Sequence, residues 1–247
     1  MNLGVGVPAD VGIVLAEEGV SDYALLTTEA GAVGGTPADD KNFGHAYNVL
    51  AQVGMHEQFD YYDGGGLDLT ILGTAQTDAR GDVNVSKFNG RVAGCGGFIN
   101  ITATAKHVVF AGSFTAGGLD VQFADGGCRI AAEGKVRKFV RDVEQITFSG
   151  EQASLAGQSV LYVTERAVFE LREGRLTLIE KAPWADLQRD ILDQMDFEPA
   201  IADDLRDMDP GIFREKWGGL KAHIDAAAER AAANSTAPQA PTPSSHK

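Results

Sequence analysis

A single glutamate stands where an apolar run meets a glycine-rich turn, in the segment TTEAGAVGGTP at residues 27–37. After this glutamate, Gly31, Gly34 and Gly35 remove side chains and permit backbone angles that other residues resist. A carboxylate in such surroundings can meet a substrate at close range. The pattern therefore predicts that Glu29 is presented at the end of a strand, with small residues around it.

Two more glycine-rich turns follow strand-like runs, at residues 64–66 and 94–97. Loops at the carboxyl ends of sheet strands usually hold the ligand in α/β proteins, so we expect both turns to converge with Glu29. Taken singly, each feature has an ordinary explanation. An acidic residue beside glycine is most often a solvated loop residue or a cap, and a glycine triplet is most often a plain turn. Only the joint order of the three segments points to a site.

The remaining reactive residue types carry less information. Cys95 lies in the third glycine turn, but no histidine is placed in sequence to activate it, so we interpret it as structural. The five histidines lack metal-ligand spacing, and no metal site is expected. Asp63 and Asp68 are expected to cap or anchor their turns.

The elements that must position these residues follow an α/β pattern. The 30 glycines are too many for a helical bundle and have no collagen period. Apolar runs predict strands at residues 23–28, 67–72, 107–112 and 119–123, and helices are predicted at residues 9–18 and 43–52. An α/β fold fits this alternation best.

The C-terminal part is predicted to be rich in β-structure and then helical. Strands are expected at residues 160–163, 167–171 and 175–179, with Arg172, Glu173 and Gly174 as a hairpin turn. After Pro183 a helix is expected, with Asp186 as its cap and an apolar face formed by Leu187, Ile191 and Met195. A last helix is predicted at residues 221–233. We assign residues 1–233 to one domain and residues 234–247, rich in Pro, Ser, Thr and Ala, to a disordered tail.

Composition limits the possible partners and setting. The formal net charge of -14 disfavours nucleic acid or an anionic membrane surface as the main partner, because both reward clustered Lys and Arg. Only Cys95 and Cys128 occur, without a CxxC pair, and no basic-then-apolar leader opens the sequence. We expect a cytoplasmic protein that binds neither nucleic acid nor a membrane.

Three motifs together resemble a known enzyme family. They are the ExGxxGGxP run at residues 29–37, the GGGLDLTxLGxAQxDxxGxxNVSKF run at residues 64–88 and the GCGGF turn at residues 94–98. In this order they are similar to the β half of the family I coenzyme A transferases, of the short-chain acyl (acetate or propionate) type. The likeness extends over roughly residues 1–213, which makes chance agreement remote.

The resemblance implies an open, mostly parallel sheet flanked by helices and a ping-pong reaction. The glutamate at the position of Glu29 would attack an acyl-CoA thioester, giving an acyl-glutamyl anhydride and then a glutamyl-CoA thioester. Backbone N–H groups near Gly96 and Gly97 would hold the oxyanion. The remaining candidates for contacts with CoA are Gly31, Gly34, Gly35, Gly64, Gly65, Asn84 and Lys87. Coenzyme A would be a substrate, with no tightly bound cofactor.

Elementary chemistry agrees with this role for the glutamate. A carboxylate with a reference pKa of about 4.3 is already ionised at neutral pH, so it needs desolvation and alignment and no general base. Local features near the site would have to offset the negative net charge, because coenzyme A and the acid are both anionic. The candidates are helix N-termini, the amides of residues 64–66, and the side chains of Lys87, Arg91 and Lys106.

By the same resemblance, the chain is expected to be half an enzyme. The sequence starts at the β-half motif, so we expect a separate β subunit, a split product or a fragment that needs an α-type half and forms an oligomer. Two alternatives stay open. The same glutamate would serve an acyl-CoA hydrolase, in which water resolves the enzyme thioester, and a non-catalytic binding or assembly subunit could have retained the fold.

Overall fold

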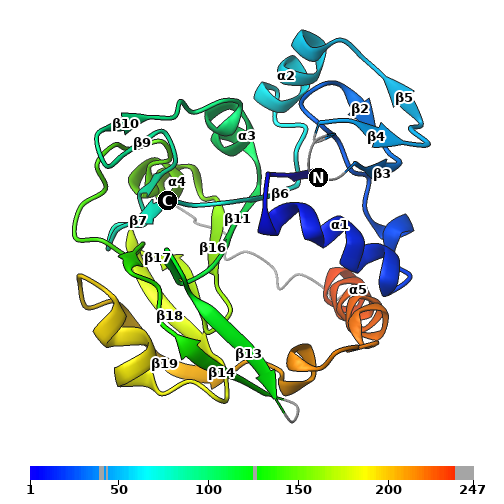
Figure 1. Cartoon of the computed structure of the whole chain (residues 1–247). Coiled ribbons are helices and arrows are strands. Elements are labelled where there is room, and N and C mark those ends of the chain that lie inside the picture. The colour runs from blue at the N-terminus through cyan, green and yellow to red at the C-terminus, as the bar shows by residue number, and fades with distance from the viewer. Residues whose placement is uncertain (39–41, 43, 125–126, 237–247) are drawn as a thin grey trace, which may run out of the picture.

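A seven-stranded mixed sheet forms the centre of the protein (Figure 1). The computed structural model describes residues 1–38, 42, 44–124 and 127–236. The strand order is β1-β6-β11-β16-β17-β18-β19. Their bounds are β1 Asn2–Leu3, β6 Leu69–Leu72, β11 His107–Ala111, β16 Ser159–Val163, β17 Ala167–Arg172, β18 Arg175–Lys181 and β19 Ala200–Asp207.

The sheet combines a parallel half with a β-rich C-terminal half. Strands β1, β6, β11 and β16 run parallel, β17 is antiparallel to both of its neighbours, and β18 and β19 are parallel. Four of the six strand pairs in this sheet are parallel: three in the first half, and the pair of β18 with β19. The predicted open and mostly parallel sheet with a β-rich C-terminal part is confirmed.

Helices connect the parallel strands, as crossover connections require. Helix α3 (Phe98–Thr104) leads into β11, and α4 (Gly150–Ala156) leads into β16. Helix α2 (Met55–Asp63) precedes β6; the Glu57 carboxylate accepts a 2.7 Å hydrogen bond from the Gly54 N–H at its start. Helix α1 (Val7–Glu17) follows β1 directly and has a proline in its first turn, where no N–H donor is lost.

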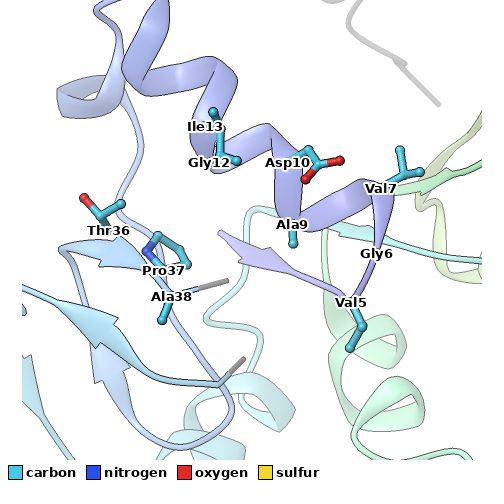
Figure 2. Close-up of a pocket in the computed structure, with 10 residues that line it drawn as sticks. All are labelled: Val5, Gly6, Val7, Ala9, Asp10, Gly12, Ile13, Thr36, Pro37 and Ala38. Atoms are coloured by element: carbon cyan, nitrogen blue, oxygen red, sulfur yellow. The ribbon is translucent and has the colours of Figure 1, made fainter. Parts of the chain in front are cut away.

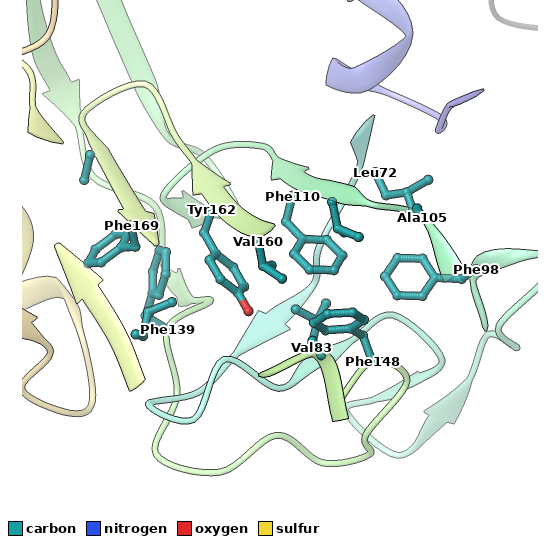
Figure 3. Packing of buried hydrophobic residues seen from close by; sticks show 14 of the residues in the cluster. Leu72, Val83, Phe98, Ala105, Phe110, Phe139, Phe148, Val160, Tyr162 and Phe169 are labelled. Carbon is teal, nitrogen blue, oxygen red and sulfur yellow. The ribbon is translucent and has the colours of Figure 1, made fainter. Parts of the chain in front are cut away.

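The core lies between the sheet and its covering segments and contains a row of aromatic rings among aliphatic side chains (Figure 3). Alternate residues of β11, Val108 and Phe110, are fully buried, as the two-residue period of a strand requires. The Phe110 ring stacks on Phe98 at 5.7 Å and meets the edge of Phe148 at 5.0 Å. Burial of each such side chain contributes roughly 1.5–3 kcal/mol, so this cluster fixes α3 against the sheet.

A buried ion network joins the β-rich half to the segments around it. Arg166 is fully buried and contacts Glu133 at 2.8 Å and Glu165 at 2.6 Å. Its guanidinium also donates to the Asp190 carbonyl at 2.9 Å and lies 5.0 Å from the centre of the Phe114 ring. Nothing in the local sequence marks this arginine, because its burial follows only from the tertiary fold.

Several short two-stranded units surround the main sheet. Two of them stand next to the Glu29 turn: β2 (Ala32–Val33) pairs with β5 (Ala51–Gln52), and β3 (Thr36–Pro37) pairs with β4 (Ala46–Tyr47). The others pair β7 (Gln76–Thr77) with β8 (Val83–Asn84), β9 (Lys87–Phe88) with β10 (Arg91–Val92), β12 (Thr115–Ala116) with β15 (Val136–Arg137), and β13 (Asp120–Ala124) with β14 (Gly127–Ala132).

The structure corrects two predictions in the N-terminal part. The helix expected at residues 43–52 is wrong, because this segment supplies β4 and β5 and the helix follows it as α2. The strand expected at residues 23–28 is also wrong. Residues Ser21–Tyr23 form a 3₁₀ turn, and within the predicted strand only Thr27 takes part in β-bridges.

A third correction concerns the helix expected after Pro183. Its place is taken by a π-helical turn at Leu187–Ile191 and a 3₁₀ turn at Leu192–Gln194. The predicted cap is present, since the Asp186 side chain accepts from Arg189 N–H at 2.8 Å. Arg137 of the distant strand β15 takes two of the later carbonyls, donating to Asp193 at 2.7 Å and to Met195 at 3.1 Å. These tertiary bonds compete with a regular helix.

Helix α5 (Leu220–Thr236) returns to the N-terminal part and lies beside α1 (Figure 1). The Glu18 carboxylate accepts from the Gly218 and Leu220 N–H groups at 2.8 and 3.2 Å, so it caps α5 across the chain. The predicted helix is present and includes residues 234–236, which were expected to belong to the tail. Residues 237–247, the rest of the predicted tail, lie outside the described residues.

Candidate active site

Glu29 sits in a tight turn between two bridged backbone segments. Thr27 pairs with Asn2 of β1 on one side and with Val33 of β2 on the other. The Gly31 N–H donates to the Thr28 carbonyl at 3.0 Å and closes the turn. The glutamate is thus held two residues beyond the edge of the main sheet by the bridges of Thr27, and the strand predicted to lead into it at residues 23–28 is absent.

The glycines of this turn are required by backbone packing. A β-carbon on Gly31 would collide with the Val53 carbonyl oxygen, and one on Gly35 would collide with the Tyr47 carbonyl oxygen. A β-carbon on Gly34 would come within 2.7 Å of the Leu50 side chain. We expected these glycines to open the way for a substrate; the structure gives them a different purpose, which is to let the β2–β3 segment lie directly on β4 and β5.

The Glu29 carboxylate points at the start of α3. A β-carbon placed on Gly97 would collide with Glu29 Oε2 and lie 2.8 Å from Cδ and 2.9 Å from Phe59 Cζ. Gly97 is the residue that immediately precedes α3. The predicted convergence of Glu29 with the GCGGF turn is therefore present, and no residue larger than glycine fits at position 97 without displacing the carboxylate.

The two glycines of this turn differ in exposure, since Gly96 is exposed and Gly97 is buried. Among the described residues, the N–H groups of Gly96 and Gly97 have no hydrogen-bond acceptor. Gly96 has a positive φ of 53°, and no heavy atom lies within 4 Å of a β-carbon built on it. The contact of Gly97 with the Glu29 carboxylate places this turn next to the carboxylate.

Burial alters the acidity of the glutamate. Glu29 is half-buried, and this desolvation raises its pKa above the usual value for a glutamate, because the charged form is penalised. A partly desolvated carboxylate is a better nucleophile than a fully hydrated one. It lines a pocket of about 200 Å³ whose walls are mostly apolar, among them Leu3, Leu26 and Met55.

A second hollow lies away from the carboxylate. Figure 2 shows this pocket, of about 320 Å³, between the first turns of α1 and the segment at Thr36. It shares Pro37 with the Glu29 pocket, but Glu29 is not part of its lining. Neither pocket has Gly96 or Gly97 in its lining.

Asn84 does not offer free polar atoms. Its side-chain NH₂ donates to Gln76 Oε1 at 2.6 Å and to the Lys87 carbonyl at 2.5 Å, while its oxygen accepts from the Ser86 and Lys87 N–H groups. Asn84 is fully buried. It organises the turn that leads into β9, and a direct contact with CoA is not what its geometry favours.

The other predicted residues are dispersed around the site. Gly64 and Gly65 end α2, where Gly65 has a positive φ of 83°, and they form no contact with Glu29 in the described structure. Lys87 is exposed on β9, in the hairpin that precedes the GCGGF turn. Lys106 forms an ion pair with Asp68 at 2.6 Å.

The two aspartates expected to cap or anchor their turns contact side chains of later segments. Asp63 accepts two hydrogen bonds from the Asn100 side chain, at 3.0 and 3.1 Å, and Asp68 holds Lys106. Cys95 is partly exposed in its turn. Within residues 1–38, 42, 44–124 and 127–236, no group of three or more His, Cys, Asp or Glu side chains could hold a metal ion.

Sequence analysis missed a buried polar group beneath the Glu29 turn. Tyr62 of α2 is fully buried and donates from its hydroxyl to Thr27 Oγ1 at 2.9 Å, and Asn2 donates to the same hydroxyl at 3.3 Å. Its only signal was an aromatic pair before the glycine triplet. Such a pair does not reveal which partner it will meet.

Comparisons with known proteins give the chain its relatives. No family model matches it. It is 52% identical over 225 residues to the caffeate CoA-transferase of Acetobacterium woodii, covering 89% of this chain and 43% of that protein. The acetate CoA-transferase YdiF of Escherichia coli K12 is 49% identical over 212 residues, which cover 86% of this chain and 40% of that one. This chain is a homologue of CoA-transferases.

Solved CoA-transferase structures agree with this relationship. The acyl-CoA transferase YdiF of E. coli O157:H7 superimposes with a TM-score of 0.84 at 48% identity, over 88% of this chain and 41% of that one. The same transferase has been solved as a thioester complex with CoA, which matches with a TM-score of 0.82. The glutaconate CoA-transferase of Acidaminococcus fermentans, at 17% identity and a TM-score of 0.61, shares the fold.

The chain spans about two fifths of the length of these homologous CoA-transferases, 40–43% of the two full-length relatives described above. A shorter relative, an acetate CoA-transferase β subunit of Haemophilus influenzae, is 27% identical and is covered to 87%. As for membranes, none of the helices in the described part of the chain is long and apolar enough to cross one.

Proposed function

We propose that this chain is the nucleophile-bearing half of a CoA-transferase, which moves coenzyme A from a short-chain acyl-CoA to a carboxylate acceptor through Glu29. The observation that carries the proposal is the contact of the Glu29 carboxylate with Gly97, beside two amides that have no acceptor among the described residues. The thioester complex of the homologous YdiF with CoA supports chemistry of this kind.

The proposed reaction begins with attack by a Glu29 oxygen on the thioester carbonyl carbon. The carbonyl π electrons move to oxygen, the Gly96 and Gly97 N–H groups bind this oxyanion, and its collapse expels CoA as a thiolate. An acyl-glutamyl anhydride remains on the enzyme. A single oxyanion donor is worth about 2.7–4 kcal/mol of transition-state stabilisation.

The next step completes the first half-reaction and places CoA on the enzyme. The thiolate attacks the Glu29 carbonyl of the anhydride, the acyl group leaves as a carboxylate, and the glutamyl-CoA thioester forms. An acceptor carboxylate then attacks this thioester, and the same steps in reverse give the new acyl-CoA and restore Glu29. Atoms and charge balance without a cofactor, and coenzyme A is substrate throughout.

We propose that an α-type half completes the site and that the assembled enzyme is an oligomer. The homologous CoA-transferases are more than twice as long as the region matched here. Apolar side chains next to the Glu29 turn are exposed, among them Tyr47, Leu50 and Met55, with 59%, 78% and 59% of their surface accessible. A second half would bury them. The exposed Lys87 and Arg91 of the β9–β10 hairpin are candidates to hold the CoA phosphates. The expected cytoplasmic location stays a prediction.

The test uses the chain together with an α-type half. Acyl-CoA is added without acceptor, the mixture is treated with borohydride, and the peptide containing Glu29 is analysed by mass spectrometry. Borohydride reduction of a glutamyl thioester gives an alcohol at Glu29, a defined mass change, and Glu29→Gln should neither show it nor transfer CoA. An unmodified Glu29 in an active enzyme would overturn the proposal.

The same experiment separates the alternatives. Release of free CoA in water, without dependence on an acceptor acid, would indicate the hydrolase. If Glu29→Gln changes neither the binding of the α-type half nor any activity of the complex, the chain is an assembly subunit.

A further inference from the structure

Tyr62 connects the two segments that meet at the candidate site. Its hydroxyl donates to Thr27 Oγ1 at 2.9 Å, two residues before Glu29. Its backbone carbonyl accepts from Thr104 Oγ1 at 2.6 Å, at the end of α3. Because Gly97 immediately precedes α3, Tyr62 bonds both to the segment that carries the carboxylate and to the helix that follows the two glycine amides.

Other contacts of α2 reinforce this connection. Phe59, three residues before Tyr62, has its Cζ atom 2.9 Å from the position that a Gly97 β-carbon would take. The rings of Phe59 and Tyr62 meet edge to face, with their centroids 5.8 Å apart. One residue after Tyr62, Asp63 accepts from the Asn100 side chain of α3. Three residues of α2, Phe59, Tyr62 and Asp63, therefore contact α3 or the glycine before it, and α2 sets the distance between α3 and the Glu29 turn.

The phenol is held as a neutral donor. Burial raises the pKa of Tyr62, and the negative charge of Glu29 raises it further, so the hydroxyl keeps its proton. The Asn2 amide donates to this hydroxyl at 3.3 Å and to the Thr27 carbonyl at 3.3 Å. Because the Tyr62 oxygen accepts a hydrogen bond from the Asn2 NH₂ group, its own proton is directed to Thr27 Oγ1.

The cost of this arrangement suggests that it serves the site. Among the described residues, Asn2 Oδ1 is buried without a hydrogen-bond partner in the protein, and the fully buried Gln58 side chain lies close enough to Tyr62 to influence its pKa. An unpaired buried polar group costs about 1–3 kcal/mol. A core built only for stability would use apolar residues here, whereas hydrogen bonds fix position and direction.

We propose that Tyr62 is a positioning residue, whose hydroxyl acts through Thr27 to hold the Glu29 carboxylate at its place against Gly97. The proposal rests on the proposed function of Glu29. A displacement of about 1 Å can lower a reaction rate about a hundredfold, so a single hydrogen bond at this point has an effect on rate that exceeds its effect on stability.

The experiment compares two buried tyrosines in the complete enzyme with its α-type half. Tyr62→Phe removes the hydroxyl and leaves the ring. Tyr162→Phe is the matched control, because this tyrosine is equally buried and its hydroxyl donates to the Gly81 carbonyl at 2.5 Å, in another part of the core. We expect Tyr62→Phe to lower kcat about 10- to 100-fold with KM for acyl-CoA nearly unchanged, and Tyr162→Phe to keep kcat at a similar loss of thermal stability.

A second comparison tests the route through Thr27. Thr27→Val removes the acceptor for the Tyr62 hydroxyl, so the double variant Tyr62→Phe/Thr27→Val should be no slower than the slower single variant. Multiplying effects would show that the hydroxyl does not act through Thr27 and would overturn the proposal. An unchanged kcat in Tyr62→Phe, or an equal loss in Tyr162→Phe, would also overturn it.

The failure of this proposal differs from the failure of the proposed function. If Glu29→Gln keeps full activity, both are wrong. If Glu29→Gln is inactive and Tyr62→Phe is fully active, the role of Glu29 stands and only the positioning role is lost.

Discussion

The Glu29 carboxylate occupies the space in which a side chain on Gly97 would begin. A β-carbon on Gly97 would lie 2.8 Å from Glu29 Cδ and would collide with Oε2. The backbone of Gly97 has φ -79° and ψ 0°, which alanine adopts freely. Any effect of a methyl group at this position therefore comes from the contact with the carboxylate and with Phe59.

Gly97→Ala should disable the site while the protein folds. The methyl group displaces Glu29, so we expect kcat/KM of the complete enzyme to fall at least about a hundredfold, with a loss of unfolding free energy of about 1–3 kcal/mol from overpacking. Enzyme kinetics and urea unfolding measure the two effects. Gly73→Ala is the control, since the nearest atom to its β-carbon is 3.9 Å away. Normal activity of Gly97→Ala would contradict the geometry.

Glu29→Gln should make the folded protein more stable at neutral pH. Burial raises the folded-state pKa of Glu29 above its usual value, so the folded protein binds this proton more tightly than the unfolded chain does. Ionisation of Glu29 therefore lowers the free energy of unfolding as the pH rises through the folded-state pKa. Below the usual pKa of about 4.3 the side chain is protonated in both states and has no such effect. The gain from Glu29→Gln should be present at pH 7 and disappear near pH 4.

Urea unfolding at several pH values measures this difference. Glu198→Gln, at an exposed glutamate, should show little change across the same range and serves as the control. A variant Glu29→Gln that is less stable than the parent at pH 7 would mean that the carboxylate is not desolvated. The acid limb of kcat/KM should likewise lie above the usual pKa of a glutamate, because only the ionised form attacks.

Gly31→Ala should cost more stability than Gly65→Ala. Both glycines have a positive φ, 98° and 83°, so both substitutions introduce backbone strain of about 1–2 kcal/mol. Only at Gly31 does the new methyl group also collide with a backbone atom, the Val53 carbonyl oxygen; at Gly65 no atom lies within 4 Å. Thermal unfolding of both variants measures the difference, and equal losses would contradict the close approach of the two segments.

Arg166→Met should destabilise the fold by about 3–5 kcal/mol, since Glu133 and Glu165 would lose their buried partner. Arg172→Met removes an exposed ion pair with Glu170 and should change the free energy of unfolding far less. Chemical denaturation of both variants at neutral pH provides the comparison. Similar losses in the two would show that the Arg166 network is hydrated.

Local sequence determined the parts of this protein that depend on neighbouring residues. The hairpin around Glu173 and Gly174 was predictable, because both residues take a positive φ in a turn that joins two β-branched and apolar runs. The strands β6, β11 and β16 were predictable from their apolar runs. The order of the glycine motifs also indicated the CoA-transferase relationship, which the homologues confirm.

Strand pairing and helix endings depended on distant residues. Residues 46–52 have no strand signal of their own and become β4 and β5 only because β2 and β3 supply partners. The strand β19 was missed, since its exposed edge carries Asp203, Asp204 and Asp207 in place of an apolar run. The helix expected after Asp186 is interrupted by hydrogen bonds from Arg137 and Arg166.

The sequence by itself determined which residue carries the carboxylate and which turns accompany it. The tertiary structure decided where the carboxylate points, which glycines make room for backbone and which one makes room for Glu29, and that Tyr62 lies beneath them. The physical reason is that residue type and spacing report local backbone preferences. Burial, desolvation and contact between Glu29 and Gly97 arise only when the sheet brings separate segments together.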